Sequence, residues 1–446
     1  MLKIYNSLTN KTENFNPINN KNIKIYSCGL TVYDKAHLGH ARTTVAVDIL
    51  VRLLKYLYKN VIYVRNITDV DDKINIRATQ RSITIQELTK EIINYCDSDM
   101  KYLNNLTPTF EPKVTENISE IIDIIQKLID NGFAYVASGN VFFDVNKYKD
   151  YGKLSNRNIE ELKKEARIEA GEYKKNALDF VLWKPSLAID DESSKFESPW
   201  GVGRPGWHIE CSALSHKYLG ENFDIHCGGV DLKFPHHENE IAQSCCAFLG
   251  SNFANYWFHT GFLMVNGEKM SKSLNNFITI EKLKNEGVNG KIVRFAMMKN
   301  HYRKPLDFNE NLIKESEKNL KDLHKNVINF ECENKVPDEV IEILCNDVNT
   351  PKVIALLNDF NNNKNYDKLK NALEFLGIFD ENLLKIDKDL SNLDITEEEI
   401  NDLIKKRNDA KKNKDWIEAD KIRDYLKLKN ILLKDSKNGV EWDIIK

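Results

Sequence analysis

The segment "IKIYSCG" (residues 23–29) is a short strand-like run that ends at a cysteine and a glycine. A helical pattern follows over about residues 39–59, where apolar residues recur at spacings of three and four: Val47, Leu50, Leu54 and Leu57. The next segment, "VIYVRNIT" (61–68), is β-branched and aromatic, as a buried parallel strand should be. Strand, helix and strand in this order predict the opening of a Rossmann-like, doubly wound parallel sheet.

The second half of this sheet is predicted further along the chain. Strand and loop signals return with "FDIHCGGVDL" (223–232), a helix begins near His236, and "YWFHTGFLMV" (256–265) is typical of another strand. The polar region at roughly 110–200 reads as an insertion between the two halves. It contains a predicted hairpin, "GFAYVASGNVFFDV" (132–145), which turns at Ser-Gly-Asn. Residues 1–305 are therefore expected to form one α/β catalytic domain.

The remainder of the chain has a different character. Residues 306–386 carry long amphipathic segments and predict an α-helical bundle. The acidic stretch "DKDLSNLDITEEE" (387–399) predicts a linker at the start of a small C-terminal domain, 387–446. Residues 401–446 hold thirteen Lys and Arg against nine Asp and Glu, a local excess of positive charge.

The overall composition is that of an ordinary soluble protein. The chain has 446 residues, 41% hydrophobic and 29% charged, with a net charge of −3. Any surface that binds RNA must therefore come from local clustering of charge. The eight cysteines include no C-x-x-C pair and are too few for a disulfide scaffold, which favours a reducing compartment. No signal peptide or apolar run of membrane-spanning length is present, so we expect a cytoplasmic chain with no membrane partner.

The segment "HLGH" (His37–His40) lies at the join between the first strand and its helix. Amide groups at a helix N-terminus bind anions, and Gly39 lets a ligand approach the backbone closely. His37 and His40 could donate hydrogen bonds to a phosphate and stabilise charge during nucleotidyl transfer. The alternative is an ordinary helix start with two surface histidines.

A second loop, 267–277, contains "KMSKS" (Lys269–Ser273). The side chains of Lys269 and Lys272 suit the capture of the outer charges of a triphosphate. By itself the segment could be an ordinary surface loop. Two such loops, one in each half of a doubly wound pattern, support each other and predict an ATP site.

The segment "HHENE" (236–240) poses the question of a metal site. His236 and Glu240 are four apart and would share one face of a helix. Spacing alone cannot choose between His236 and His237 as the ligand. Without further residues, a solvated helix is the simpler interpretation.

The two nucleotide loops together resemble the signatures of class I aminoacyl-tRNA synthetases. Further segments resemble the cysteinyl-tRNA synthetase family: "YSCGLTVYDKAHLGHAR" (26–42), "NITDVDDKI" (66–74), "GWHIECSAL" (206–214), "DIHCGGVDLKFPHHENEIAQS" (224–244), "GEKMSKSLNNF" (267–277), "NDVNTPK" (346–352), "DWIEADKIRDYL" (415–426) and "NGVEW" (438–442). The resemblance spans essentially the whole chain. Gly39–His40 departs from the Gly-Asn pair that is frequent in that family, and Cys227 stands where glycine or serine is common.

The resemblance implies a zinc ion, one per subunit, held by four residues of this chain: Cys28, Cys211, His236 and Glu240. Two thiolates, an imidazole and a carboxylate are a plausible zinc set. The ligands come from distant points of the chain, each near the carboxyl end of a predicted strand, where open α/β sheets bind ligands. We therefore expect the metal beside the ATP loops.

The resemblance also implies the reaction. ATP with Mg²⁺ would activate L-cysteine to cysteinyl-adenylate, and the cysteinyl group would pass to the 3′ terminal adenosine of tRNA(Cys). Zinc would select the substrate thiol, His37 and His40 would stabilise the transferring phosphate, and Lys272 the departing pyrophosphate. The substrate pocket would include four further residues: Thr68, Trp207, His226 and Asp231. The C-terminal domain would recognise the anticodon, and we expect a monomer.

Three alternatives compete with this interpretation. The first is a cysteine ligase with the same core that uses an amino-sugar acceptor, which lacks the C-terminal segments quoted above. The second is an H-x-G-H nucleotidyltransferase that makes a dinucleotide cofactor, against which "KMSKS" and the cysteines argue. The third is a non-catalytic zinc protein that binds RNA, which has no use for two phosphate loops.

Overall fold

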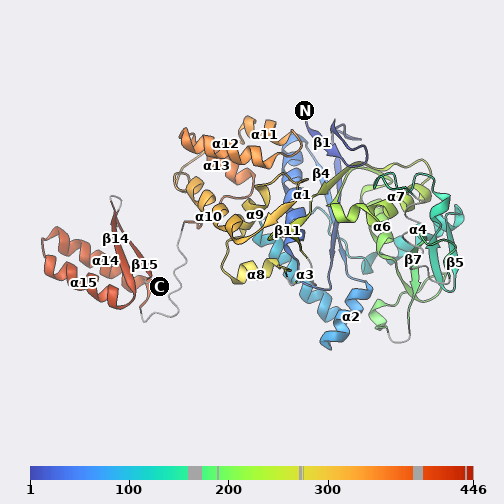
Figure 1. Ribbon diagram of the computed structural model, residues 1–446, viewed down its shortest axis with the longest axis horizontal. Coiled ribbons are helices and arrows are strands. Elements are labelled where there is room, and N and C mark those ends of the chain that lie inside the picture. Colours follow the sequence, from blue (N-terminus) through green and yellow to red (C-terminus); the bar gives the residue numbers. More distant parts are fainter. Residues whose placement is uncertain are drawn as a thin grey trace. The chain divides into compact units, whose positions relative to one another are not determined.

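The computed structural model describes residues 1–158, 173–187, 190–270, 274, 276–384, 395–436 and 439–444. These residues form two compact units, Met1–Glu381 and Asn382–Lys446 (Figure 1). The larger unit and the smaller unit each have a hydrophobic core of their own. None of the helices in the described ranges combines the length and the apolar character that a membrane span requires.

A parallel sheet of four strands lies at the centre of the larger unit, in the order β10–β9–β3–β4. Its strands are β3 (Ile23–Thr31), β4 (Val61–Thr68), β9 (Asn222–Gly229) and β10 (Phe253–Thr260). The chain adds β4 on one side of β3, and later adds β9 and β10 on its other side. The winding direction therefore reverses between β3 and β9, which confirms the predicted doubly wound fold. In such sheets, ligands bind at the carboxyl ends of the strands beside this reversal.

Helices cover both faces of the sheet (Figure 1). Helix α1 (Leu38–Leu57) packs on one face, and its extent agrees with the predicted range of about 39–59. Helices α6 (Trp207–Leu219) and α7 (His236–Ala247) pack on the other face. One hydrophobic core unites these two helices with inward-facing strand residues: Tyr26, Val64, Phe223 and Trp257. The predicted helix start at His236 is confirmed.

The segment between β4 and β9 carries helices and a second, antiparallel sheet. The helices are α2 (Asp72–Arg81), α3 (Ile85–Tyr102) and α4 (Ile118–Asp130). The strands, in sheet order, are β5 (Ala134–Ala137), β6 (Asn140–Phe143), β7 (Phe180–Pro185) and β8 (Gly203–Pro205). The predicted hairpin is confirmed as β5 and β6, because Ser138 (φ 51°) and Gly139 (φ 75°) adopt the positive φ angles of a tight two-residue turn.

The prediction of one strand over 256–265 is wrong. Strand β10 ends at Thr260, and β11 (Leu263–Val265) joins another sheet with β12 (Glu268–Lys269) and β13 (Leu306–Phe308). At the break, the Gly261 amide donates to the Tyr302 carbonyl at 2.8 Å. A Cβ atom on Gly261 would lie 2.7 Å from the backbone of Arg303, so this close crossing requires glycine and ends the strand.

Helices dominate the rest of the larger unit. They are α8 (Ile280–Asn285), α9 (Gly290–Met298), α10 (Glu310–His324), α11 (Asp338–Leu344), α12 (Thr350–Asn362) and α13 (Tyr366–Phe375). A fully buried guanidinium ties this region to the sheet domain, because Arg294 on α9 pairs with Asp48 on α1 and donates to the Leu376 carbonyl at 2.8 Å. A short N-terminal hairpin completes the unit, β1 (Lys3–Asn6) with β2 (Lys11–Asn14).

The smaller unit consists of two helices and a hairpin. These elements are α14 (Glu397–Lys412), α15 (Trp416–Leu428), β14 (Ile431–Ser436) and β15 (Gly439–Ile444). Its core is formed by Ile395, Ile400, Ile422, Leu426, Ile431 and Trp442. Most of the predicted linker 387–399 lies outside the described residues, and its last three residues form the first turn of α14.

Candidate active site and metal centre

The H-x-G-H segment forms the N-terminus of α1. His37 is the N-cap, and its Nδ1 atom accepts a hydrogen bond from the His40 amide at 3.4 Å. The two imidazole rings stack with their centres 3.6 Å apart. A Cβ atom on Gly39 would lie 2.8 Å from the His37 ring, so this arrangement depends on glycine. Burial lowers the pKa of His40 well below its ordinary value, and the nearby His37 lowers it further, so His40 is a neutral donor.

The chain that follows the K-M-S-K-S motif lies directly against this turn. The Leu38 amide donates to the Ile278 carbonyl and the Ile280 amide donates to the Ala36 carbonyl, each at 3.0 Å. The ring of Phe277 meets the His37 ring edge-on at 5.0 Å. These contacts bring residues 277–280, which follow the K-M-S-K-S motif, next to the N-terminus of α1.

Lys269 is exposed on β12, and its Nζ atom lies 5.2 Å from the centre of the Phe262 ring. Lys272 lies outside the described residues.

The four predicted metal ligands come together on the opposite side of the sheet from α1. The ligand atoms of Cys28, Cys211, His236 and Glu240 all lie within 4.8 Å of one another. Cys28 is on β3, just beyond Ser27, the last residue at which β3 pairs with β9. Cys211 comes from α6, and the other two residues from α7. The cluster thus lies at the reversal point of the sheet, where ligands are expected to bind.

The local geometry of α7 explains two of these positions. His236 and Glu240 are one helical turn apart, and the Nε2 atom of His236 lies 3.0 Å from Glu240 Oε1. The other imidazole nitrogen, Nδ1, lies 2.9 Å from His208 Nδ1. This second contact fixes the ring and leaves Nε2 directed at the cluster.

The charges of the cluster are strongly coupled. Burial raises the pKa of the Cys211 thiol, but hydrogen bonds with Cys28 and His236 outweigh burial and lower that pKa to about 6. Burial and the neighbouring Cys211 raise the pKa of Cys28 well above its ordinary value. Burial also raises the pKa of Glu240, but the adjacent His226 and His236 hold it well below the usual range. A divalent cation would satisfy the buried thiol of Cys211, the partly buried thiol of Cys28 and the buried carboxylate of Glu240 at once, so the donor set fits zinc.

A second set of donors overlaps the first. It consists of Cys28, His226, His237 and Glu240. His226 Nε2 lies 2.7 Å from Glu240 Oε2, and His237 Nε2 lies 3.3 Å from Cys28 Sγ. Both histidines of the "HHENE" segment are therefore within reach of the same centre. The first set contains two thiols, whereas the second set contains one thiol and two imidazoles.

The four residues predicted for the substrate pocket occupy different environments. Thr68 is buried and donates through Oγ1 to Glu210 Oε2 at 2.9 Å. Trp207 is 39% exposed, and its ring stacks on His236 with centres 4.2 Å apart. His226 is fully buried beside Glu240. Asp231 is exposed in the loop that follows β9.

Comparison with known proteins gives the family. The model of the tRNA synthetases class I (C) catalytic domain matches residues 14–318. Cysteine–tRNA ligase of Ehrlichia ruminantium (strain Gardel) is 48% identical over 457 residues, which cover 98% of each chain. The enzyme of that name from Rickettsia bellii (strain OSU 85-389) is 46% identical over 451 residues, again 98% of each chain. The chain belongs to the cysteine–tRNA ligase family.

Solved structures of lower identity share the fold. Methionyl-tRNA synthetase of Mycobacterium tuberculosis, in complex with methionyl-adenylate, is 14% identical, with a TM-score of 0.51 over 87% of this chain and 84% of that one. The LeuRS–tRNA–LeuAMS complex of Agrobacterium radiobacter K84 is 11% identical, with a TM-score of 0.55 over 81% of this chain and 84% of that chain. The Rossmann-like fold of class I synthetases is therefore confirmed for this member of the family.

Residues that the sequence did not single out surround the family's motifs. Asn66 accepts from the Gly29 amide at 2.8 Å and donates to Thr68 Oγ1 at 3.1 Å. Glu210 is buried beside Thr68, and burial raises its pKa well above the ordinary value. His208 contacts His236, and His259 contacts His237. Trp207, His208 and Glu210 also line a cavity of about 330 Å³ between α6 and the antiparallel sheet. Trp207 was predicted for the substrate pocket, whereas the only sequence signal of His208 and Glu210 was proximity to a motif residue.

Proposed function

We propose that this chain attaches L-cysteine to tRNA(Cys) in an ATP-dependent reaction. The observation that carries the proposal is the cluster with two cysteine thiols at the switch point of the sheet, in a chain of the cysteine–tRNA ligase family. Such a cluster suits recognition of a thiol substrate through a bound metal. The amino-sugar ligase alternative is not favoured, because the tRNA ligases named above align with 98% of this chain, the C-terminal segments included.

In the first step, a carboxylate oxygen of cysteine attacks the α-phosphorus of ATP. The bond between this phosphorus and the bridging oxygen breaks, pyrophosphate leaves with the electron pair, and cysteinyl-adenylate remains. His37, His40 and the amides of the α1 N-terminus donate hydrogen bonds to the phosphate, which Gly39 lets approach closely. Lys269 and Lys272 offset the charge of the pyrophosphate, and Mg²⁺ accompanies ATP.

We assign one zinc ion per chain to Cys28, Cys211, His236 and Glu240, whose side chains fit this metal in kind and in spacing. When bound, zinc would supply a position that takes a substrate thiol as thiolate in preference to a hydroxyl. Residues around the centre would hold the rest of the amino acid: Thr68, Trp207, His226 and Asp231. A site built around one polar contact can discriminate by about 10⁴–10⁵, which would exclude serine without an editing site.

In the second step, a ribose hydroxyl of the terminal adenosine attacks the carbonyl carbon of the adenylate. AMP leaves with the electron pair, and the hydroxyl proton is released to solvent. In this scheme residues 1–305 carry the chemistry, 306–386 form the bundle, and 387–446 recognise the anticodon. Trp416 is 60% exposed and available to stack on a base, whereas Trp442 packs in the core of the smaller unit.

The state of the cysteines and the content of each chain bear on where and in what form the protein acts. All eight cysteines are free thiols, in keeping with a reducing compartment. We propose that the chain acts in the cytoplasm as a monomer, because each chain carries a complete cluster and both signature segments.

The test combines metal content with amino-acid activation. The purified protein should hold about one zinc per chain and should catalyse ATP–pyrophosphate exchange with cysteine at least about 10⁴-fold better than with serine. Cys211→Ser should lose zinc and exchange together, whereas Cys332→Ser, which alters a thiol remote from the cluster, should keep both. A metal-free wild-type protein with full activity would refute the zinc assignment, and cysteine-dependent exchange without charging of tRNA(Cys) would revive the amino-sugar alternative.

A further inference from the structure

An ion pair lies beside the contact between the two signature segments. The Nζ atom of Lys35 lies 2.6 Å and 2.7 Å from the two carboxylate oxygens of Glu281. Lys35 stands two residues before His37, and Glu281 lies in the first turn of α8. The pair therefore joins the approach to the H-x-G-H turn to the segment that follows the K-M-S-K-S motif.

The surroundings restrict both partners. Only 29% of the Lys35 side chain and 25% of the Glu281 side chain are exposed. Beneath the ammonium group, the Tyr95 ring on α3 lies with its centre 4.1 Å from Nζ. A half-buried charge with two oxygen partners and an aromatic face is held more firmly than a typical surface pair.

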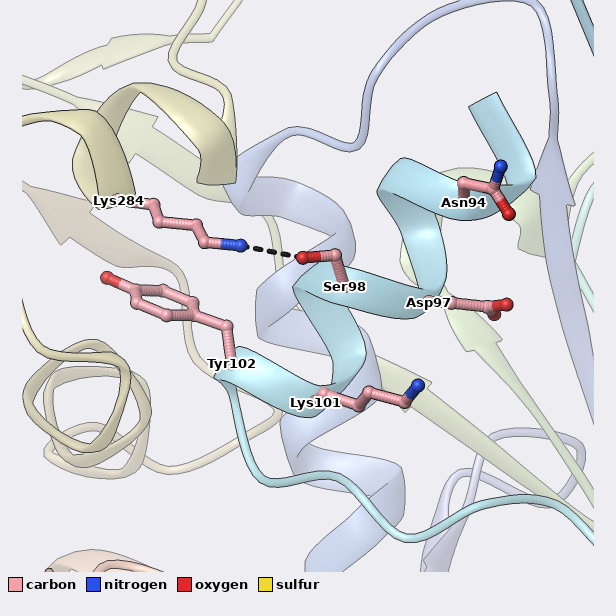
Figure 2. Close-up of a pocket in the computed structure, with 6 residues that line it drawn as sticks. All are labelled: Asn94, Asp97, Ser98, Lys101, Tyr102 and Lys284. Carbon is pink, nitrogen blue, oxygen red and sulfur yellow. Dashed lines mark hydrogen bonds between the residues drawn. The ribbon is translucent and has the colours of Figure 1, made fainter. Parts of the chain in front are cut away.

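Helix α8 has a second attachment, to α3. Figure 2 shows Lys284 of α8 donating to Ser98 of α3, at 2.6 Å, beside the ring of Tyr102. The two helices border a cavity of about 550 Å³, and α8 buries the side chains of Ile280 and Leu283. The residues that line it are Asn94, Asp97, Ser98, Lys101, Tyr102 and Lys284. The Lys284–Ser98 hydrogen bond and the Lys35–Glu281 ion pair add to this apolar packing and help to set the position of α8.

We propose that Lys35 and Glu281 are positioning residues that hold residues 277–281 against the H-x-G-H turn and so orient the His37 ring. Two backbone hydrogen bonds join the segments, from the Leu38 amide to Ile278 and from the Ile280 amide to Ala36. Lys35 directly precedes Ala36 and Glu281 directly follows Ile280, so the ion pair helps to keep the two segments aligned. Phe277 at the end of this segment contacts the His37 ring. The inference rests on the proposed function, because it takes His37 as a residue that acts on ATP.

Removal of the Lys35–Glu281 ion pair should lower the rate of ATP–pyrophosphate exchange with little loss in the free energy of unfolding. A partly exposed ion pair contributes little to the free energy of unfolding. A displacement of about 1 Å at a reacting group can cost up to about 100-fold in rate. Cysteine binding depends on the metal cluster on the other face of the sheet, so it should not respond.

The experiment compares Lys35→Met, Glu281→Gln and the charge exchange Lys35→Glu with Glu281→Lys in the full-length protein. Both single variants should lower kcat of ATP–pyrophosphate exchange about tenfold, with the KM for cysteine and Tm nearly unchanged. The exchanged pair should recover most of the lost rate. Glu91→Gln is the matched control, because Glu91 pairs with Arg81 through both oxygens on the exposed α2–α3 surface and should leave kcat unaltered.

Amide hydrogen exchange supplies a readout that does not depend on activity. Protection of the Leu38 and Ile280 amides should fall in both single variants and return in the exchanged pair. Unaltered protection, or a charge exchange that recovers neither protection nor rate, would overturn the proposal. If wild-type protein shows no cysteine-dependent activity, the proposed function fails while the protection data still decide the positioning role.

Discussion

His236 and His237 are neighbours in sequence, yet their rings have different partners. His236 directs Nε2 at Glu240, and its Nδ1 contacts His208. His237 directs Nε2 at Cys28, and its Nδ1 contacts His259. Each ring could bind a metal at the same centre, and only the first belongs to the donor set with two thiols. Zinc favours thiolate ligands, so we expect His236 to be the ligand.

Substitution of each histidine separates the two donor sets. His236→Asn should lose most of its zinc and cysteine-dependent exchange, because the thiol-rich set then lacks its imidazole. His237→Asn should retain about one zinc per chain, with affinity lowered by about 10–100-fold at most. Metal analysis of both proteins after dialysis against a weak chelator is the measurement. The opposite order of zinc retention would move the centre to the second set.

Asp99 on α3 is a buried acid outside the active site. It is 2% exposed, and its Oδ2 atom has no hydrogen-bond partner among the residues that the structure describes. Burial raises its pKa to about 7, although the nearby Lys284 and Lys35 oppose the shift and Glu281 adds to it. The folded chain therefore keeps this proton over a range in which the unfolded chain releases it. Its contribution to stability is present below about pH 4 and is lost as pH rises through 7.

Asp99→Asn removes this penalty. The gain in the free energy of unfolding should be larger at pH 8 than at pH 5, by on the order of 2 kcal/mol. Chemical denaturation at both pH values measures it. Asp97→Asn, which changes an exposed neighbour on the same helix, should show no such difference. Equal gains at the two pH values would show that Asp99 is already ionised at pH 5.

At this scale, sequence motifs predicted four residues that the structure brings together in one cluster and missed the residues that hydrogen-bond to them. Cys28 and His236 could be predicted because each stands in a recognisable segment. Asn66 also stands in a quoted segment, but its contact could not be predicted, and neither could that of His259, because their partners Gly29 and His237 come near only in the folded chain. A hydrogen bond between residues on different elements has no characteristic spacing in the sequence that would reveal it.

At the scale of elements, strand β3 carries a constraint at Gly29. The pairing of β3 with β4 shifts register between Ser27 and Leu30. A Cβ atom on Gly29 would lie 1.6 Å from the Asn66 carbonyl oxygen. The two strands can approach this closely only because residue 29 is glycine, and the same approach places Cys28 at the metal cluster.

Gly29→Ala should therefore separate the strands. We expect a loss of about 3 kcal/mol or more in the free energy of unfolding, together with loss of metal. Gly250→Ala is the control, because nothing lies within 4 Å of its Cβ position and only its φ of +95° is unfavourable. That variant should cost about 1–2 kcal/mol and keep its metal. Metal retention by Gly29→Ala would mean that Cys28 is not fixed by this approach.

Hydrophobic patterns predicted most elements near the site and failed where a strand changes sheets. Helix α1 and strand β4 follow their patterns because one face or both faces are buried. The run 256–265 is mostly apolar and is interrupted only by His259, Thr260 and Gly261, and the prediction did not take Gly261 as the mark of a break. That break depends on the carbonyl of Tyr302, which lies in a distant part of the sequence.

At the scale of the whole molecule, the candidate site belongs to the larger of the two units. Every described residue of the candidate site lies in Met1–Glu381. The smaller unit presents exposed apolar side chains along α15 and beyond it: Trp416, Ile417, Tyr425, Leu428 and Leu432. The sequence predicted three domains, 1–305, 306–386 and 387–446, with a linker at the start of the third. It could not assign Trp416 to the surface and Trp442 to the core, because both lie in amphipathic segments.

Ending the chain after Leu384 should separate activation from charging. ATP–pyrophosphate exchange should stay within about threefold of wild type, because the site and its core remain complete. Charging of tRNA(Cys) should fall on the order of 100-fold through loss of cationic and stacking contacts, and binding of tRNA by the intact chain should weaken as salt rises. A parallel decline of both activities, or undiminished charging, would exclude a tRNA-reading role for the smaller unit.

The four residues of the candidate metal cluster are synthesised at different times in each newly made chain. Cys28 leaves the ribosome long before Cys211 and α7, and at synthesis rates of about 5–20 residues per second the wait is roughly 10–40 s. During that interval β3 has no β9 to pair with, and the thiol of Cys28 has none of its later partners. A centre built from this cluster can be filled only after residue 240 has emerged. If the cluster binds zinc as proposed, a shortage of the metal would act only on chains that have already formed β3, α6, β9 and α7, and the thiol of Cys28 would lack its partners until then.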